Sequence, residues 1–283
     1  KLGSIDTGVA ILAPLKKDDS DRNRTSPFAF TGNKFEFRML GSSQSVAFCN
    51  TVLNTAVAEC FSKFADRIEN SADIEKEVAL IISDTMGKHG RVIFNGNNYT
   101  PEWVSEAAER GLPNLSTTLD AIESMIAPKN IGLFEKHGVF SEHECHARYE
   151  VLLENFCKVV NIEADTLLQM VRRQIYPAAV TVAGDAARSL NAMHTAGFEN
   201  DGVRDYVGRL SELARGIYEL CEELDFACWE LPPEQECKKR AGAIQNTVRP
   251  IMKSLREKCD MLEVIMPADQ WPLPTYTDLM HRV

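Results

Sequence analysis

Residues 203–224 read Val-Arg-Asp-Tyr-Val-Gly-Arg-Leu-Ser-Glu-Leu-Ala-Arg-Gly-Ile-Tyr-Glu-Leu-Cys-Glu-Glu-Leu, with apolar side chains at steps of three and four. This spacing is typical of an amphipathic helix that buries one face. Similar spacing on both sides indicates further long helices joined by short turns, and such helices pack antiparallel. From Ser141 onward the sequence therefore predicts a helical bundle, with helices at about 141–176, 178–195, 202–231 and 233–265.

The same periodicity predicts which side chains these helices bury. In the first helix they are Tyr149, Leu152, Phe156, Val159, Leu167, Val171 and Ile175. In the third they are Val203, Tyr206, Leu210, Leu213, Ile217, Leu220 and Leu224. In the fourth they are Ile244, Val248, Ile251, Leu255, Cys259 and Leu262. Because proline lacks an N–H and its ring crowds the preceding turn, we expect Pro177 to interrupt or kink the first helix and Pro250 to kink the fourth.

Shorter elements are expected before residue 141. Helical spacing predicts helices at about 46–68, 72–87, 101–110, 116–126 and 129–136. The first of these has its apolar side chains at Val46, Cys49, Val52, Leu53, Ala56, Val57, Cys60, Phe61 and Phe64. The short run Arg91–Phe94 resembles a strand.

The last residues, 267–283, interrupt the helical pattern. They contain three prolines together with Trp271 and Tyr276. Large aromatic side chains are rare in unstructured chain termini, so we expect an extended tail that docks on a folded surface.

Composition excludes several classes of protein. The 283 residues include 41 acidic and 31 basic side chains, a formal charge of −10, which disfavours binding to nucleic acid or to an anionic membrane surface. No apolar run is long enough to span a bilayer. The eight cysteines are scattered and include no Cys-x-x-Cys pair, so we expect reduced thiols in a cytoplasmic protein.

One cluster, Glu142-His-Glu-Cys-His146, has the composition of a metal site. Zinc needs three or four converging ligands, and the spacing here is not the His-Glu-x-x-His pattern that places two imidazoles one helical turn apart. Ser141 and Glu144 fit a capping box at the start of a long helix. We therefore interpret the cluster as a solvated first helical turn rather than as a zinc site.

The segment with candidate metal-binding and phosphate-binding side chains lies near the start of the chain. Residues 34–39 alternate charged and apolar side chains, which predicts a strand with Lys34, Glu36 and Arg38 on one face. Arg22 and Arg24 precede it, and arginine suits the recognition of phosphate or carboxylate. A carboxylate among such cations can hold Mg²⁺ while its neighbours hold phosphate oxygens. The alternative is a surface strand with a ladder of ion pairs.

These residues carry a resemblance to a known family. The block Arg24-Thr-Ser-Pro-Phe-Ala-Phe-Thr-Gly-Asn-Lys-Phe-Glu-Phe-Arg38 resembles the end of the catalytic domain of glutamine synthetases of the type III class. Similarity continues through Asn50-x-x-Leu-Asn54-x-x-x-Ala-Glu59 and Ile93-Phe-Asn-Gly-Asn-Asn-Tyr-Thr-x-Glu-Trp103. It extends through Arg148-Tyr-Glu-x-Leu-Leu-Glu-Asn155 to Trp271-Pro-Leu-Pro-Thr-Tyr276, and so covers nearly the whole chain.

The resemblance implies a fold and an activity. The fold is mainly α: a helical C-terminal domain, 69–283, follows a short α+β remnant, 1–68, that holds the last strand and helix of a catalytic barrel. The activity is ligation of glutamate and ammonia, driven by ATP through γ-glutamyl phosphate, with Mg²⁺ or Mn²⁺ ions bridging the phosphates. The family also implies a homo-oligomer, a dodecamer of two stacked hexameric rings.

The resemblance also implies residue roles. Glu36 corresponds to a ligand of one metal ion, Arg38 to a contact of the transferring phosphoryl group, and Arg24 to a contact of phosphate or of the substrate carboxylate. Lys34 and Arg22 lie where the family often has further basic residues near the nucleotide. The family's additional arginine has no counterpart here, because the matching stretch is Pro27-Phe-Ala-Phe30.

Most of the family's active site has no counterpart in this chain. Further metal-binding carboxylates, a metal-binding histidine and a flap glutamate come earlier in the family, and the chain starts at Lys1 rather than at a methionine. We therefore expect the chain to be part of a longer protein and to be inactive by itself. The competing hypothesis is a non-catalytic helical scaffold or oligomer-assembly module that keeps the strand for structure only. A helical adaptor protein would leave residues 21–38 unexplained.

Overall fold

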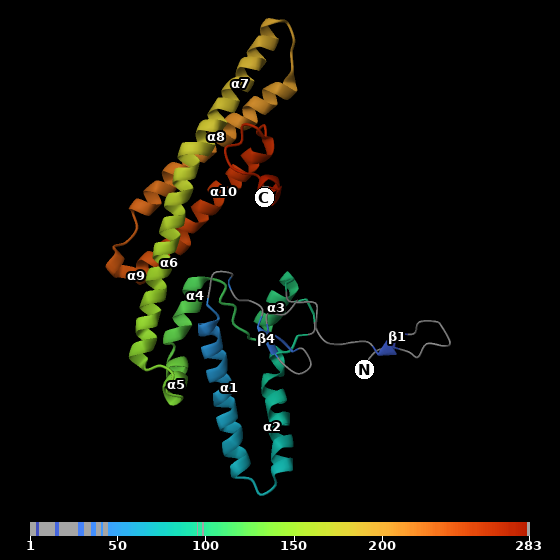
Figure 1. Ribbon diagram of the computed structural model, residues 1–283, viewed down its shortest axis with the longest axis vertical. Helices are drawn as coiled ribbons and strands as arrows, with labels where there is room; N and C mark the ends of the chain where they lie inside the picture. Colours follow the sequence, from blue (N-terminus) through green and yellow to red (C-terminus); the bar gives the residue numbers. More distant parts are fainter. Residues whose placement is uncertain are drawn as a thin grey trace. The chain divides into compact units, whose positions relative to one another are not determined.

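The structure is a computed structural model that describes residues 4–5, 15–16, 28–30, 35–37, 41, 45–94, 96–97 and 99–281 (Figure 1). The described chain is mainly helical, which confirms the predicted fold class at that level. None of its helices is both long enough and apolar enough to cross a membrane.

Among the residues that the structure describes, the strands are few and short. They are β1 Ser4–Ile5, β2 Leu15–Lys16, β3 Phe28–Phe30 and β4 Phe35–Phe37. The helices of the first half are α1 Val46–Glu69, α2 Ile74–His89, the 3₁₀ turn η1 Gly90–Val92, α3 Pro101–Glu109, α4 Thr118–Glu123, the 3₁₀ turn η2 Ser124–Ile126 and α5 Pro128–Lys136. The second half contains α6 Glu142–Met170, the π turn η3 Val171–Ile175, α7 Tyr176–Thr195, α8 Asp201–Trp229, the 3₁₀ turn η4 Glu234–Glu236, α9 Cys237–Ala243, the π turn η5 Ile244–Val248, α10 Arg249–Ile265 and α11 Tyr276–His281.

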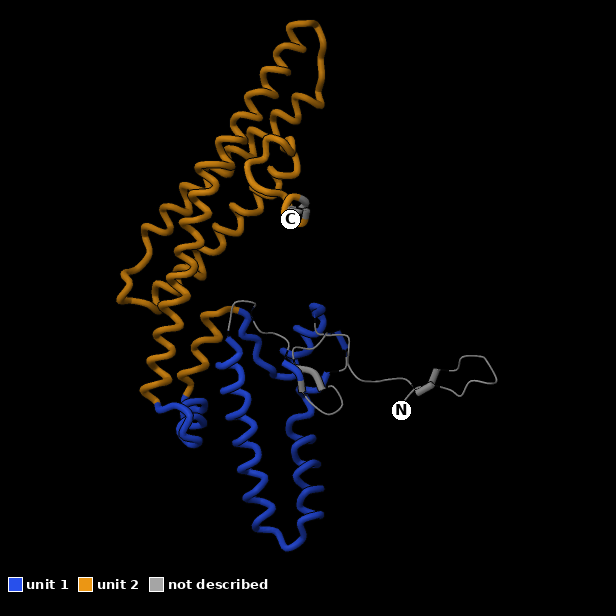
Figure 2. Tube along the Cα trace, viewed as in Figure 1, with its two compact units in different colours: residues 1–116, 128–141 blue, residues 117–127, 142–283 orange. Residues whose placement is uncertain are grey.

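The chain divides into two compact units (Figure 2). Unit 1 takes residues 1–116 and 128–141, and unit 2 takes residues 117–127 and 142–283. The predicted division into domains 1–68 and 69–283 remains a prediction.

Unit 2 is a bundle in which α8 packs against both α7 and α10, and α6 packs against α8 and α9. Helix α8 begins where the Asn200 side chain accepts a hydrogen bond from the Val203 N–H at 3.1 Å, and it ends just before Pro232-Pro233. All seven apolar side chains predicted for this helix are buried or half-buried. All six predicted for the fourth helix are buried: Ile244, Val248, Ile251, Leu255, Cys259 and Leu262.

The buried face of α6 differs from the prediction at two positions. Leu153 and Val160 are buried at 2% and 6% exposure, whereas the predicted Leu152 and Val159 are exposed. In both cases two apolar residues are adjacent, so periodicity alone does not decide which one faces the core.

The two prolines that were expected to interrupt or kink long helices, Pro177 and Pro250, each follow a π turn. In η3 the Tyr176 N–H bonds to the Val171 carbonyl, and in η5 the Arg249 N–H bonds to the Ile244 carbonyl, five residues back in each case. Pro177 and Pro250 then lie within the first turn of the next α-helix, where the missing N–H costs little. The chain therefore stays helical from Glu142 to Thr195, rather than breaking at Pro177, because one extra residue per turn accommodates the proline.

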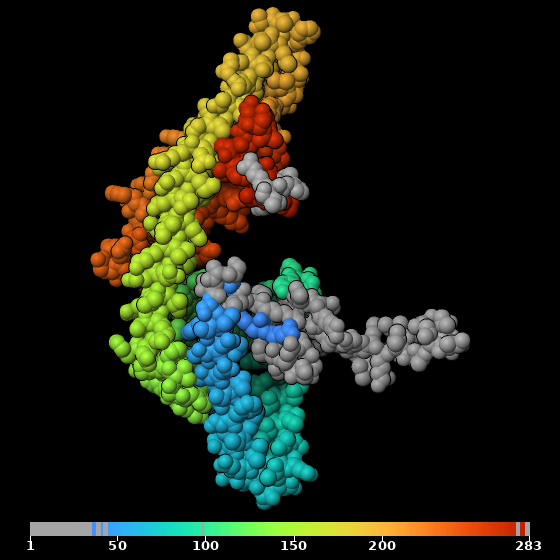
Figure 3. Space-filling model, viewed as in Figure 1, coloured from blue at the N-terminus to red at the C-terminus, as the bar shows by residue number. Residues whose placement is uncertain are grey.

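The C-terminal segment packs against the other helices of unit 2. Trp271 and Leu273 pack against its core, and Figure 3 shows this segment, in red, against the bundle. Within the stretch predicted to be extended, residues 276–281 form the short helix α11.

Unit 1 contains two antiparallel pairs of strands, β1–β2 and β3–β4, and the hairpin of α1 and α2. The strand-like run Arg91–Phe94 was predicted wrongly, because α2 continues directly into η1, where the Ile93 N–H bonds to the Gly90 carbonyl at 3.0 Å. A run of only four residues is too short for its periodicity to distinguish a strand from a helix.

Helix α1 forms within one residue of its predicted bounds, but much of its apolar surface is exposed. Its N-terminus is capped by Ser45, whose side chain accepts a hydrogen bond from the Ala47 N–H at 3.2 Å. Phe61 is 67% exposed, and Val46, Val52 and Val57 are exposed as well. An exposed apolar surface of this kind is typical of a face that another protein surface covers.

Candidate functional site

The predicted metal ligand, Glu36, lies in the middle of β4. The strand pairs antiparallel with β3, and Glu36 is directly opposite Ala29. Its side chain is half-buried, and the neighbouring Phe37 is 42% exposed on the other face. The structure thus confirms a strand at the predicted place, over residues 35–37.

The four predicted cations cannot be placed around this carboxylate. Arg22, Arg24, Lys34 and Arg38 lie outside the residues that the structure describes. Their proposed roles remain predictions.

A divalent cation would find one suitable ligand at Glu36. Mg²⁺ and Mn²⁺ prefer oxygen ligands, and an ionised carboxylate is the usual one. Within the described ranges, no group of three or more His, Cys, Asp or Glu side chains converges on a common point. Glu36 therefore fits a metal as one ligand among several, and the described part of the chain does not supply the others.

The cluster at residues 142–146 divides between core and solvent. Cys145 is fully buried in the first turns of α6, whereas His143 and His146 are exposed. The three side chains do not converge.

Helix α1, which comes after strand β4 in the chain, contains an ionic cluster centred on Glu59. The Glu59 Oε2 atom lies 2.7 Å from Lys136 Nζ and 2.8 Å from His137 Nε2, while Oε1 lies 3.0 Å from Lys63 Nζ. Lys136 ends α5 and His137 follows it, so the cluster fastens α5 to α1. Hydrogen bonds from Lys136, His137 and Lys63 lower the pKa of Glu59 to about 2. The sequence analysis included Glu59 in a motif but did not predict its partners Lys136 and His137, which lie 77 and 78 positions further along the chain.

This cluster predicts a specific acid sensitivity. The carboxylate has its ordinary value of 4.5 in the unfolded chain and stays ionised down to about pH 2 in the folded chain. Its contribution to stability is therefore complete above pH 4.5 and is lost as the pH falls towards 2. We expect Glu59→Gln to unfold at a lower temperature than the parent at neutral pH, with the difference vanishing near pH 2.

Thermal unfolding followed by circular dichroism across this range measures the difference. Glu69→Gln, which removes an exposed carboxylate from the same helix, is the matched control for the loss of one charge. A difference between Glu59→Gln and parent that is the same at every pH would contradict a role for the ionised carboxylate.

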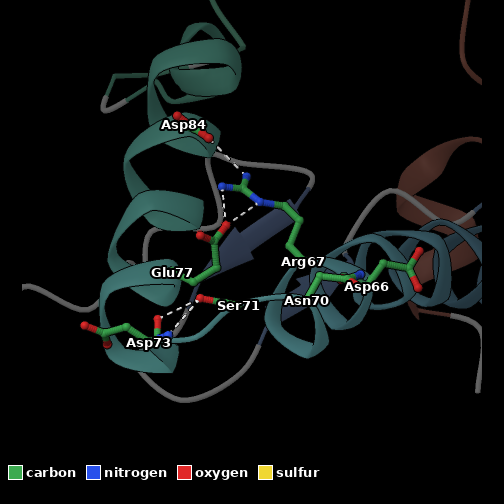
Figure 4. Close-up of polar contacts among 7 residues, drawn as sticks. All are labelled: Asp66, Arg67, Asn70, Ser71, Asp73, Glu77 and Asp84. Carbon is green, nitrogen blue, oxygen red and sulfur yellow. Dashed lines mark hydrogen bonds and ion pairs between the residues drawn. The ribbon is translucent and has the colours of Figure 1, made fainter.

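A second polar cluster fixes the turn between α1 and α2 (Figure 4). Arg67 donates through Nε and Nη2 to Glu77 at 2.7 and 2.6 Å, and through Nη1 to Asp84 at 3.0 Å. These contacts raise the pKa of Arg67, with Glu77 contributing most. Because the guanidinium is bound to both carboxylates, the arrangement stabilises a helical hairpin rather than presenting a free cation to a ligand.

The turn itself is closed by short-range hydrogen bonds. Asp73 caps α2 by accepting from the Lys76 N–H at 3.1 Å, and Ser71 Oγ accepts from the Asp73 N–H at 3.2 Å. Asn70 donates to the Asp66 carbonyl at 2.6 Å. An open concavity of about 570 Å³ lies over this turn, and the side chains of Arg67, Asn70, Ser71 and Glu77 in its lining are engaged in the contacts just described.

An aromatic cluster holds the segment between α2 and α3. The rings of Phe94 and Trp103 stack with centroids 4.1 Å apart, and the Arg110 guanidinium lies 5.4 Å from the Trp103 ring centre. Arg110 also donates to the carbonyls of Arg91 and Ile93 at 3.1 and 2.9 Å. A Cβ atom at Gly96 would come within 2.5 Å of the Phe94 ring, so a larger residue there would force the ring to shift. These motif residues therefore have a structural role.

Comparison with known proteins shows what this chain is similar to. Residues 77–194 match the model of the glutamine synthetase C-terminal domain. The chain is 35% identical to the type-3 glutamine synthetase of Dictyostelium discoideum, in an alignment over 98% of the chain and 39% of that protein. It is 34% identical to the glutamine synthetase of Butyrivibrio fibrisolvens over 93% of the chain, and 30% identical to that of Bacteroides fragilis (strain YCH46) over 96%.

The chain spans only 38–39% of the length of these curated relatives. The similarity nevertheless covers nearly all of the chain and includes the block from Arg24 to Arg38, because an alignment over 98% of the chain leaves out only a few residues. The chain is therefore similar over nearly its whole length to glutamine synthetases, and its residues 77–194 match their C-terminal domain.

Proposed function

We propose that this chain is the C-terminal part of an ATP-dependent glutamate–ammonia ligase that forms glutamine by way of γ-glutamyl phosphate. The observation that carries the proposal is the 35% identity to a type-3 glutamine synthetase over 98% of the chain. The substrates are glutamate, ammonia and ATP, and the cofactor is Mg²⁺ or Mn²⁺. The protein functions in the cytoplasm.

In this proposal the β3–β4 hairpin contributes to the catalytic centre. Glu36 supplies one oxygen ligand to a divalent ion, which when bound neutralises charge on the phosphates. Arg38 binds the transferring phosphoryl group, and Arg24 binds phosphate or the substrate carboxylate. Lys34 and Arg22 lie near the nucleotide. The half-buried position of Glu36 on a paired strand supports this role, because a strand holds its side chain in a fixed direction.

Residues 1–68 form, in this proposal, the last strand and helix of a catalytic barrel, and residues 69–283 form the helical C-terminal domain. The exposed apolar surface of α1 supports this division. Phe61 and the valines of α1 would be covered by the remaining part of the longer protein, which in the relatives accounts for about three fifths of the length. The protein assembles as a dodecamer of two hexameric rings.

The test compares two polypeptides. One contains this chain within the full length of the relatives, and the other is the 283-residue chain alone. With glutamate, ammonia, ATP and Mg²⁺, we expect the longer polypeptide to form glutamine and ADP in equal amounts. We expect the chain alone to give only background, because the residues that the structure describes supply Glu36 as the one proposed metal ligand.

Two outcomes would contradict the proposal. Turnover by the chain alone would mean that the active site is complete within it. A longer polypeptide that folds and assembles, as judged by circular dichroism and light scattering, but forms no glutamine would favour the scaffold or assembly module.

A further inference from the structure

A small pocket of about 170 Å³ in unit 2 brings together two cysteines that are 80 residues apart. Cys157 lies on α6, and Cys237 is the first residue of α9. The rest of the lining includes the cations Lys158 and Arg240 and the carboxylates of Glu154 and Glu234. The proposed function does not use this pocket.

The two cysteines are close in space. The Cys157 Sγ atom lies 3.9 Å from the backbone carbonyl oxygen of Cys237, and α6 packs against α9 along this stretch. A disulfide requires Cα atoms about 4.4–6.8 Å apart, and a sulfur this near the partner's backbone is compatible with that range. Neither cysteine is in a disulfide in the structure.

The two thiols differ in their access to solvent. Cys157 is 5% exposed, and burial, as the main cause, raises its pKa to about 11. Cys237 is half-buried and lies at the start of its helix. Of the two, Cys237 is therefore the thiol that a small oxidant reaches, and Cys157 is the partner behind it.

Two cations are held beside this pair. Arg240 donates through Nη1 to the Pro232 carbonyl at 2.7 Å, and Lys158 contacts Glu154 at 2.9 Å. The thiolate, rather than the thiol, is the form of cysteine that reacts with peroxides.

We propose that Cys237 and Cys157 form a peroxide-responsive pair that closes into a disulfide between α9 and α6. The Cys237 thiolate attacks one oxygen of hydrogen peroxide, the O–O bond breaks, and the other oxygen leaves as hydroxide, which gives a sulfenic acid on Cys237. The Cys157 sulfur then attacks the Cys237 sulfur. The S–S bond forms, the S–O bond breaks, and the hydroxyl leaves as water with the Cys157 proton. Two thiols lose two electrons, and one peroxide is reduced to two waters.

A second thiol pair provides an internal control. Cys221 and Cys259 are 2% and 3% exposed, and the pKa of Cys259 is raised to about 12 by burial first and by Cys221 in addition. Both thiols are almost completely buried in the core cluster, and neither lines the pocket of Cys157 and Cys237. They should remain reduced under conditions that oxidise the pair in the pocket.

The experiment treats the folded chain with hydrogen peroxide, blocks the remaining thiols, and maps disulfide-linked peptides by mass spectrometry without reduction. We expect one major link, between the peptides of Cys157 and Cys237, with Cys221 and Cys259 recovered as blocked thiols. We expect the Cys157→Ala variant to accumulate the sulfenic acid on Cys237, trapped there by dimedone. The control Cys60→Ser, at an exposed cysteine of unit 1, should leave the link unchanged.

The disulfide should also change stability. Because it closes a long loop, the oxidised parent should unfold several degrees higher than the reduced parent. The Cys237→Ser variant should show no such rise. A link from Cys237 to Cys228 instead, dimedone on Cys157 but not Cys237, or no link in folded protein would overturn the proposal. None of these outcomes depends on ligase activity. A failure of the proposed disulfide can therefore be distinguished from a failure of the proposed function.

Discussion

Replacing Glu36 with alanine in the longer polypeptide is expected to lower glutamine formation about 100-fold or more. The carboxylate would be one of the oxygen ligands of a divalent ion, and such an ion contributes several kcal/mol by neutralising charge on the transferring phosphoryl group. At about 1.4 kcal/mol per factor of ten, the loss of a ligand and of the ion it holds reaches this size. Steady-state rates measured over a range of Mg²⁺ concentrations give the effect.

The companion variants separate metal binding from structure. Glu36→Gln keeps the shape of the side chain but removes the charge, so it should need more Mg²⁺ and should recover part of the rate when Mg²⁺ is raised. Glu75→Ala removes an exposed carboxylate from the first turn of α2 and should leave the rate unchanged. If Glu36→Ala kept the parent rate while assembling normally, the strand would be structural and the scaffold hypothesis would gain.

The candidate site was predictable only where its chemistry is local in sequence. The alternation of charged and apolar residues around Glu36 predicted a strand, and β4 lies there, paired with β3. The cluster at Glu59 depends on Lys136 and His137, which reach it only because α5 returns to α1. A single sequence contains no signal for that return, since both partners also suit an ordinary exposed helix end.

The helices were predictable because periodicity over long segments is a strong signal, and α8 and α10 bury the side chains that it indicated. The sequence did not predict that the helix continues from α6 through Pro177. The effect of a proline depends on whether the preceding turn can widen to accommodate it, and η3 widens by one residue in a fully helical context. The same solution occurs at Pro250, after η5.

Sequence periodicity also leaves undecided which face of α6 is buried. Leu152 and Leu153 are adjacent, chemically identical and on one helix, yet Leu153 is 2% exposed and Leu152 is 36% exposed. Only tertiary packing distinguishes them, because Leu153 lies in the core cluster with residues of α8 and α10. The pair therefore measures the contribution of burial with helix propensity and side-chain chemistry held constant.

We expect Leu153→Ala to lower the free energy of unfolding of unit 2 by about 2–5 kcal/mol, because it removes buried methyl groups and leaves a cavity that close-packed neighbours fill only in part. Leu152→Ala should cost about 1 kcal/mol or less, since much of its side chain already contacts water. Urea unfolding followed by circular dichroism gives both values from the same transition. Equal losses, or a larger loss at Leu152, would place the other leucine in the core. Such a result would mean that α6 is rotated about its axis relative to the structure, and Val160 would then have to leave the core together with Leu153.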